Sequence, residues 1–161
     1  MSTGGRVVRY AAVLTASFLL LSGCSPAISY IVVRKGDGFY VSDEHCPLRT
    51  ITQVRVVGWD PEKRTEVGDD WVAVPIDSSG DALPPAGLKI GGASGTWTQA
   101  PNSDFLIEPS REVLVEIARD GNASGGGSAY DLELEVGHYR SSSGQVGDWR
   151  TLVDASECLS E

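Results

Sequence analysis

The sequence predicts one all-β domain, a small β-sandwich or partly open barrel, that follows an apolar N-terminal leader. Its 161 residues, 41% hydrophobic and 22% charged, suffice for one modest core and exclude a second full domain. Seven to nine short segments alternate apolar with polar residues, and Gly, Pro, Asp and Ser separate them as turn residues. We therefore divide the chain into a leader at 1–23, a tether at 24–28 and a β-rich domain at 29–161.

The first two strands of the domain are expected to form a hairpin. Apolar residues at 30–33 and 39–41 flank the segment 35–38, which reads Lys-Gly-Asp-Gly. Glycine and aspartate tolerate the positive φ angles that a tight turn requires, so this spacing predicts a hairpin.

The central strands are assigned from the parity of their apolar residues. The residues expected to face the core are Thr52, Val54 and Val56 in one strand, and Val72, Val74 and Ile76 in the next. Turn residues at 60–63 end the first, and the proline-containing loop 77–85 ends the second. Residues 88–90 are expected to form a short edge strand.

The C-terminal part of the domain is expected to contain a second hairpin. Residues 130–136 alternate apolar residues with Asp131, Glu133 and Glu135, which a strand would place together on the solvent face. Residues 112–119 fit either a strand or a helical stripe. Their three β-branched residues and the Gly-rich loop that follows favour a strand.

The leader has the parts of a secretory signal. Arg6 and Arg9 form a basic start, and an uncharged apolar run extends from Tyr10 to Leu21. The run ends in Leu21-Ser22-Gly23-Cys24, which resembles the lipobox of bacterial lipoproteins.

This resemblance implies that the leader is cut between Gly23 and Cys24 and that Cys24 carries a diacylglyceryl thioether. Two acyl chains anchor a protein firmly in a lipid bilayer, since each buried CH₂ contributes about 0.8 kcal/mol. The expected location is the extracytoplasmic face of the cell membrane, with the outer membrane possible in a two-membrane cell. The alternatives are an uncleaved spanning leader and simple secretion.

With Cys24 lipidated, Cys46 and Cys158 remain as a pair in an oxidising compartment, where a disulfide is the default. A zinc site would need about four ligands. The chain adds only His45 and His138, and none of the usual CxxC spacings occurs. We therefore expect a disulfide, no metal and no cofactor.

The strand pattern also resembles the immunoglobulin-like sandwich, which implies two packed antiparallel sheets. The Cys…Trp…Cys pattern of that family is matched loosely by Cys46, by Trp59 or Trp71, and by Cys158. The terminal position of Cys158 suits a staple at the edge of the domain better than a bridge through its core.

The charge and the motifs favour a non-catalytic role. After Gly23 the chain has 11 basic and 22 acidic residues, a net charge of −11, so nucleic acid is excluded as a partner. No catalytic motif stands out, and we expect a binding or accessory module whose partner is an envelope protein or a carbohydrate. The alternatives are a small envelope hydrolase that uses His45 or His138, and a structural subunit of an envelope complex.

The four tryptophans are the remaining candidates for ligand contact. Trp97 is the preferred one, because it follows a Gly-rich loop and is flanked by two threonines. Packing in the core is the alternative for the same residue.

Overall fold

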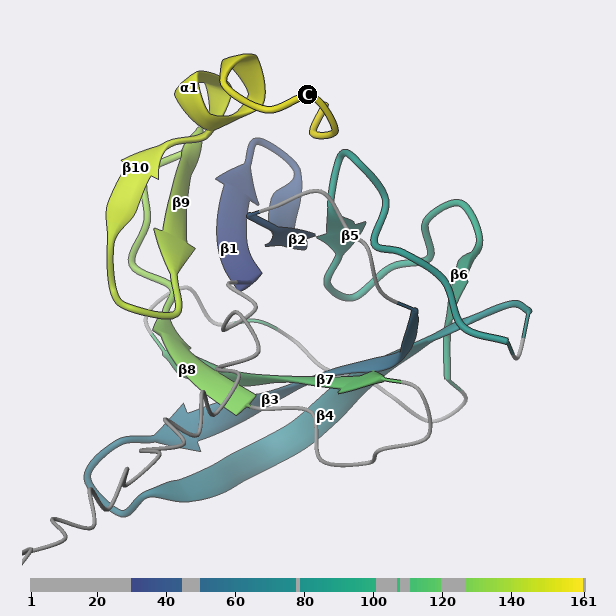
Figure 1. Ribbon diagram of the computed structural model, residues 1–161. Coiled ribbons are helices and arrows are strands. Elements are labelled where there is room, and N and C mark those ends of the chain that lie inside the picture. The colour runs from purple at the N-terminus through teal and green to yellow at the C-terminus, as the bar shows by residue number, and fades with distance from the viewer. Residues whose placement is uncertain are drawn as a thin grey trace, which may run out of the picture.

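The computed structural model describes residues 30–44, 50–77, 79–100, 107, 111–119 and 127–160 (Figure 1). In these residues the fold is all-β: two antiparallel five-stranded sheets and one short helix. The strands of the two sheets lie crosswise to each other in Figure 1.

Sheet A has the strand order β10-β9-β1-β2-β5. Its strands are β1 (Tyr30–Lys35), β2 (Gly38–Asp43), β5 (Leu88–Lys89), β9 (His138–Ser141) and β10 (Val146–Asp148). The predicted hairpin of β1 and β2 is confirmed, and β5 is the predicted edge strand.

Sheet B has the strand order β6-β4-β3-β7-β8. Its strands are β3 (Ile51–Asp60), β4 (Thr65–Pro75), β6 (Trp97–Gln99), β7 (Glu112–Arg119) and β8 (Gly127–Asp131). The ambiguous segment is therefore a strand, and it pairs with β8 as the predicted hairpin.

The main core lies between the sheets, because each sheet turns every second side chain inward. Sheet A contributes among others Val32 and Val41, and sheet B contributes Val54, Val56 and Trp71, all fully buried. The buried face predicted for β3 is thus confirmed at Val54 and Val56.

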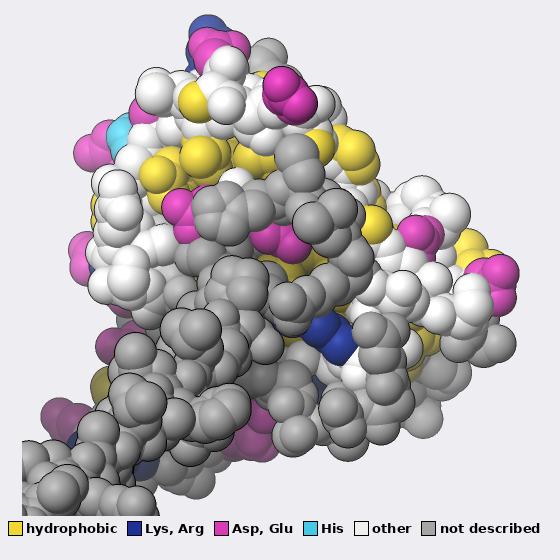
Figure 2. Space-filling view, in the orientation of Figure 1, with side chains coloured by type: hydrophobic (Ala, Val, Ile, Leu, Met, Phe, Trp, Pro, Cys, Tyr) yellow, Lys and Arg dark blue, Asp and Glu magenta, His cyan; other side chains and the backbone are white. Residues whose placement is uncertain are grey.

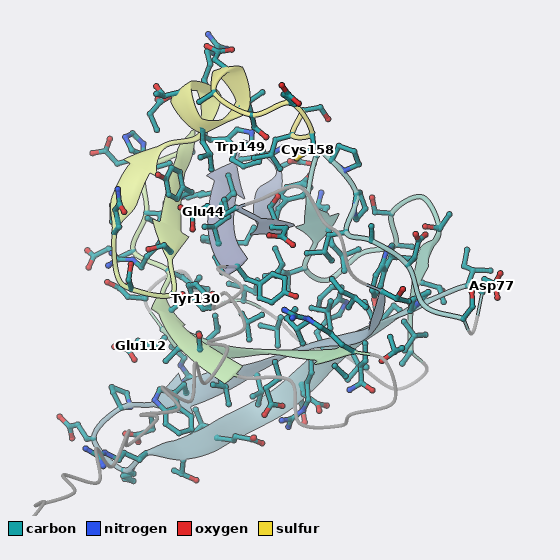
Figure 3. All side chains as sticks on the ribbon, viewed as in Figure 1. Glu44, Asp77, Glu112, Tyr130, Trp149 and Cys158 are labelled. Carbon is teal, nitrogen blue, oxygen red and sulfur yellow. The ribbon has the colours of Figure 1, made fainter. Side chains whose placement is uncertain are left out.

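The outer face of sheet A is covered as well. Helix α1 (Trp149–Asp154) lies over it and forms a second cluster with Ile31, Val33 and Tyr139. Figure 2 shows hydrophobic side chains gathered beneath α1, and Figure 3 places Trp149 there. Residues 30–33 are therefore all buried, because alternate side chains enter different clusters.

The buried face predicted for β4 is wrong. Trp71 and Ala73 face the core, whereas Val72 and Val74 are half-buried on the outer face and Ile76 is 68% exposed beyond the end of the strand. The large indole of Trp71 buries more apolar surface than a valine would, and this decides which face turns inward.

The strand predicted at 130–136 ends early, at Asp131. The Asp131 side chain accepts a hydrogen bond from the backbone N–H of Glu133 at 2.8 Å, which turns the chain away from the ladder. Leu132 and Leu134 are still buried, and Val136 is 58% exposed.

Candidate functional site

A row of outward-facing side chains crosses sheet B at one end. Trp59 in β3 lies opposite Glu112 in β7, and Glu112 lies opposite Asp131 in β8. Residues directly opposite each other in an antiparallel sheet share a face. Since the next residues in β7 and β8, Val113 and Tyr130, are buried in the core, the row faces outward.

A β-bulge shapes this end of β3. The register with β4 shifts between Val57 and Gly58, and the two backbones approach closely there. A Cβ atom at Gly58 would lie 2.5 Å from the carbonyl oxygen of Val67, so glycine is required at this position. The bulge increases the local twist of the β3–β4 hairpin beside the row.

The row borders an open groove of about 540 Å³. The groove is lined by Trp59, Asp60, Pro61, Val67, Arg111, Glu112, Asp131 and Glu133. Figure 3 shows Glu112 at the end of sheet B opposite to Asp77. Five of the eight lining residues are charged, so this open groove differs from the mostly apolar pockets that enclose small ligands.

Beside the groove, Arg55 forms ion pairs with three carboxylates. It pairs with Glu66 at 2.7 Å, Asp70 at 2.7 Å and Glu116 at 2.8 Å on the outer face of sheet B. Hydrogen bonds from Arg55 lower the pKa of Glu66, and the three carboxylates raise the pKa of Arg55. Val57 lies opposite Asp70 on this outer face of sheet B. Val57 is nevertheless buried.

Two carboxylates of the groove itself have no such partner. The side chains of Glu112 and Glu133 make no hydrogen bond or ion pair with any residue that the structure describes. Asp131, in contrast, pairs with Arg140 at 3.1 Å, and Asp60 pairs with Lys63 at 2.9 Å. The groove therefore has an excess of negative charge next to an aromatic ring.

Trp97 does not fit the predicted ligand contact. Its side chain is 1% exposed, and its indole N–H donates to the carbonyl oxygen of Ala82 at 3.0 Å. It pairs into sheet B opposite Pro75, so the ring fills the main core, which was the alternative.

Trp59, one of the four tryptophan candidates but not the preferred one, is the half-buried tryptophan, since Trp71, Trp97 and Trp149 are all buried. The signal was its parity. Trp59 is an odd-numbered residue in a strand whose even-numbered Val54 and Val56 face the core, and the same parity places Arg55 on the outer face.

Of the other predicted site residues, the structure describes Cys158 and His138. Cys158 is half-buried near the C-terminus, and its Sγ lies 3.4 Å from the hydroxyl of Ser156. Gly23, Cys24, His45 and Cys46 lie outside the described residues, so lipidation, leader cleavage and the Cys46–Cys158 bond stay predictions.

His138 starts β9, half-buried, and its Nδ1 makes no hydrogen bond in the described part of the chain. No serine hydroxyl is bonded to its ring there, as a nucleophile would be. No group of three or more His, Cys, Asp or Glu within the described ranges could hold a metal ion.

None of the helices in the described ranges is long and apolar enough to span a bilayer. Comparison with protein-family models, with curated proteins and with solved structures finds no match to this chain.

Proposed function

We propose that the protein is a lipid-anchored, non-catalytic binding module on the extracytoplasmic face of a bacterial membrane. The groove beside Trp59 is the observation that carries the binding role, because it combines an accessible aromatic ring with unpaired carboxylates. The lipobox-like residues Leu21 to Cys24 support the anchor. Only a short stretch separates Cys24 from the start of β1 at Tyr30, so the anchor would hold the domain close to the bilayer.

We also propose that the domain is a variant of the immunoglobulin-like sandwich. The pairings β1-β2-β5 and β8-β7-β3-β4 match the A-B-E and G-F-C-C′ pairings of a variable-type domain. The chain departs from that fold in three ways: β6 follows β5 in sequence, β9 and β10 extend sheet A beyond β1, and the strands of the two sheets lie crosswise instead of aligned (Figure 1).

The Cys46–Cys158 disulfide is part of the same proposal. It would tie the segment after β2 to the residues that follow α1, closing a loop of about 113 residues. The chain-entropy model gives such a loop a stabilisation of about 4.7 kcal/mol.

The test is the intact mass of the full chain extracted from bacterial membranes with detergent, followed by peptide mapping with and without reductant. We expect a chain that begins at Cys24 with a diacylglyceryl-sized addition. We also expect a peptide pair joining Cys46 to Cys158 that separates on reduction.

Two variants make the result specific. Cys24→Ala should lose both the added mass and the cleavage after Gly23, whereas the matched Cys158→Ser variant should keep both. An unmodified Cys24 on a full-length chain would contradict the anchor. Free thiols at Cys46 and Cys158 in the membrane extract would contradict the disulfide.

A further inference from the structure

We propose that the Trp59 groove binds a basic segment of a partner protein, with one lysine or arginine side chain over the indole. This inference rests on the proposed binding role and names the chemistry of its partner. The residues that carry it are Trp59, Glu112 and Glu133, which line one groove.

Charge complementarity is the first argument. Among the groove residues, Asp60, Glu112, Asp131 and Glu133 are acidic and only Arg111 is basic. Arg55 cannot offset Glu112 or Glu133, because its guanidinium already contacts Glu66, Asp70 and Glu116. The whole chain is also acidic, with a formal net charge of −9, so the field around the groove attracts cations.

The aromatic ring is the second argument. A cation within about 6 Å of a tryptophan ring is attracted by the negative face of the π system. The same chain already makes such a contact, because the Lys35 ammonium lies 4.8 Å from the Trp149 ring. Trp149 is buried beneath α1, whereas Trp59 is half-buried beside the groove and is available to a cation from outside the domain.

The number of unpaired carboxylates selects a segment over a small amine. Glu112 lies in β7, and Glu133 lies two residues beyond Asp131, the residue opposite Glu112 in β8, so the two carboxylates come from neighbouring strands. A single ammonium ion over the Trp59 ring supplies one positive charge for two unpaired carboxylates. A segment with two basic residues supplies a positive charge for each of them.

The experiment uses the purified domain-bearing chain in detergent and a blocked pentapeptide of alternating serine and lysine. Isothermal titration calorimetry at low and at physiological salt measures the affinity, and the indole N–H signals in NMR locate the contact. We expect measurable binding that weakens at least fivefold on adding salt, with a shift of the Trp59 signal alone.

Three variants and one matched control test the assignment. Trp59→Leu should weaken binding about tenfold, and Glu112→Gln and Glu133→Gln should each weaken it about fivefold. Glu135→Gln removes a carboxylate outside the groove that is exposed, as Glu133 is, and should change affinity less than twofold. The Glu→Gln variants keep the shape of the side chain, so they remain informative if Trp59→Leu does not fold.

Several outcomes would overturn the inference. One is equal binding of a peptide with glutamine in place of lysine, and another is an equal effect of Glu135→Gln and Glu112→Gln. Equal affinity for blocked lysine alone would show a small-amine site instead of a docking site for a segment. A lipidated chain that binds no basic peptide would refute this inference and leave the proposed anchor intact. A membrane-extracted chain that binds the peptide but carries no lipid would support this inference and refute the anchor.

Discussion

Replacing Arg55 with methionine tests whether the charge network on sheet B stabilises the fold. Methionine keeps an unbranched side chain at this position but removes the guanidinium that holds Glu66, Asp70 and Glu116. The network sits at the surface, since Arg55 is 22% exposed and its partners 44%, 40% and 38%. Exposed pairs contribute about 0.2–1 kcal/mol each, so three pairs give about 0.6–3 kcal/mol at neutral pH.

The stabilisation should depend on pH in a defined direction. Arg55 lowers the pKa of Glu66 in the folded state, so this contribution is fully present above the pKa of the unfolded chain. It is lost as the pH falls through the lowered pKa of the folded state, where the carboxylate becomes protonated. The difference in stability between the two proteins should therefore be largest near pH 7 and should shrink below about pH 4.

Urea unfolding at pH 7 and at pH 3 measures both quantities. The destabilisation of Arg55→Met at pH 7 should also shrink in 1 M salt, because exposed pairs are screened. Lys63→Met is the control, since the Lys63 side chain is 75% exposed and pairs with Asp60 at the hairpin turn, and it should leave stability unchanged. An equal loss of stability for Arg55→Met at pH 7 and pH 3 would refute the electrostatic reasoning and assign the effect to packing.

Three further substitutions probe the packing. Trp97→Ala should lower the free energy of unfolding by about 3–5 kcal/mol, because it empties a core site and leaves the Ala82 carbonyl without its donor, and a loss below about 1 kcal/mol in urea unfolding would contradict its core position. Tyr130→Phe should cost about 1–2 kcal/mol, since the Tyr130 hydroxyl donates to the backbone oxygen of Tyr30 at 2.8 Å; burial raises the pKa of Tyr130, so ultraviolet titration should lose one late-ionising tyrosine in this variant. Gly58→Ala should cost about 2 kcal/mol, because its methyl group would overlap a backbone carbonyl in β4, and an unchanged melting temperature would show that the bulge relaxes.

Local sequence signals predicted those parts of the fold that depend on neighbouring residues. The Gly and Asp residues at 36–38 fix a turn whatever lies around it, and the hairpin of β1 and β2 forms as expected. The β-branched residues of β7 likewise favoured a strand, which the pairing of Glu112 with Asp131 bears out.

Features that depend on which strands pair and pack together were predicted less well from the sequence. In β4 both parities contain apolar residues, and the choice of Trp71 over Val72 is made by the space between the sheets. The candidate site shows the same limit. Glu112, Asp131 and Trp59 meet through the registers of β7 with β3 and β8, which no single segment of sequence contains.

The groove residue Trp59 could have been found by extending one observation. The buried parity of β3 was predicted correctly at Val54 and Val56, and counting three residues further places Trp59 on the outer face. Trp97 was preferred because a flanking glycine loop suggests exposure, yet pairing with β4 draws the ring into the core.

The ends of the two sheets have a consequence for how copies of the protein meet. Three of the four edge strands, β5, β6 and β10, contain only two or three residues, and the fourth, β8, contains five, so each offers few free backbone groups to a neighbouring chain. Held by the proposed lipid anchor, copies of the protein would share a two-dimensional surface, where collisions between neighbours are far more frequent than in dilute solution. Short edge strands let such molecules collide without pairing into a shared sheet, so crowding at the bilayer would not cause polymerisation.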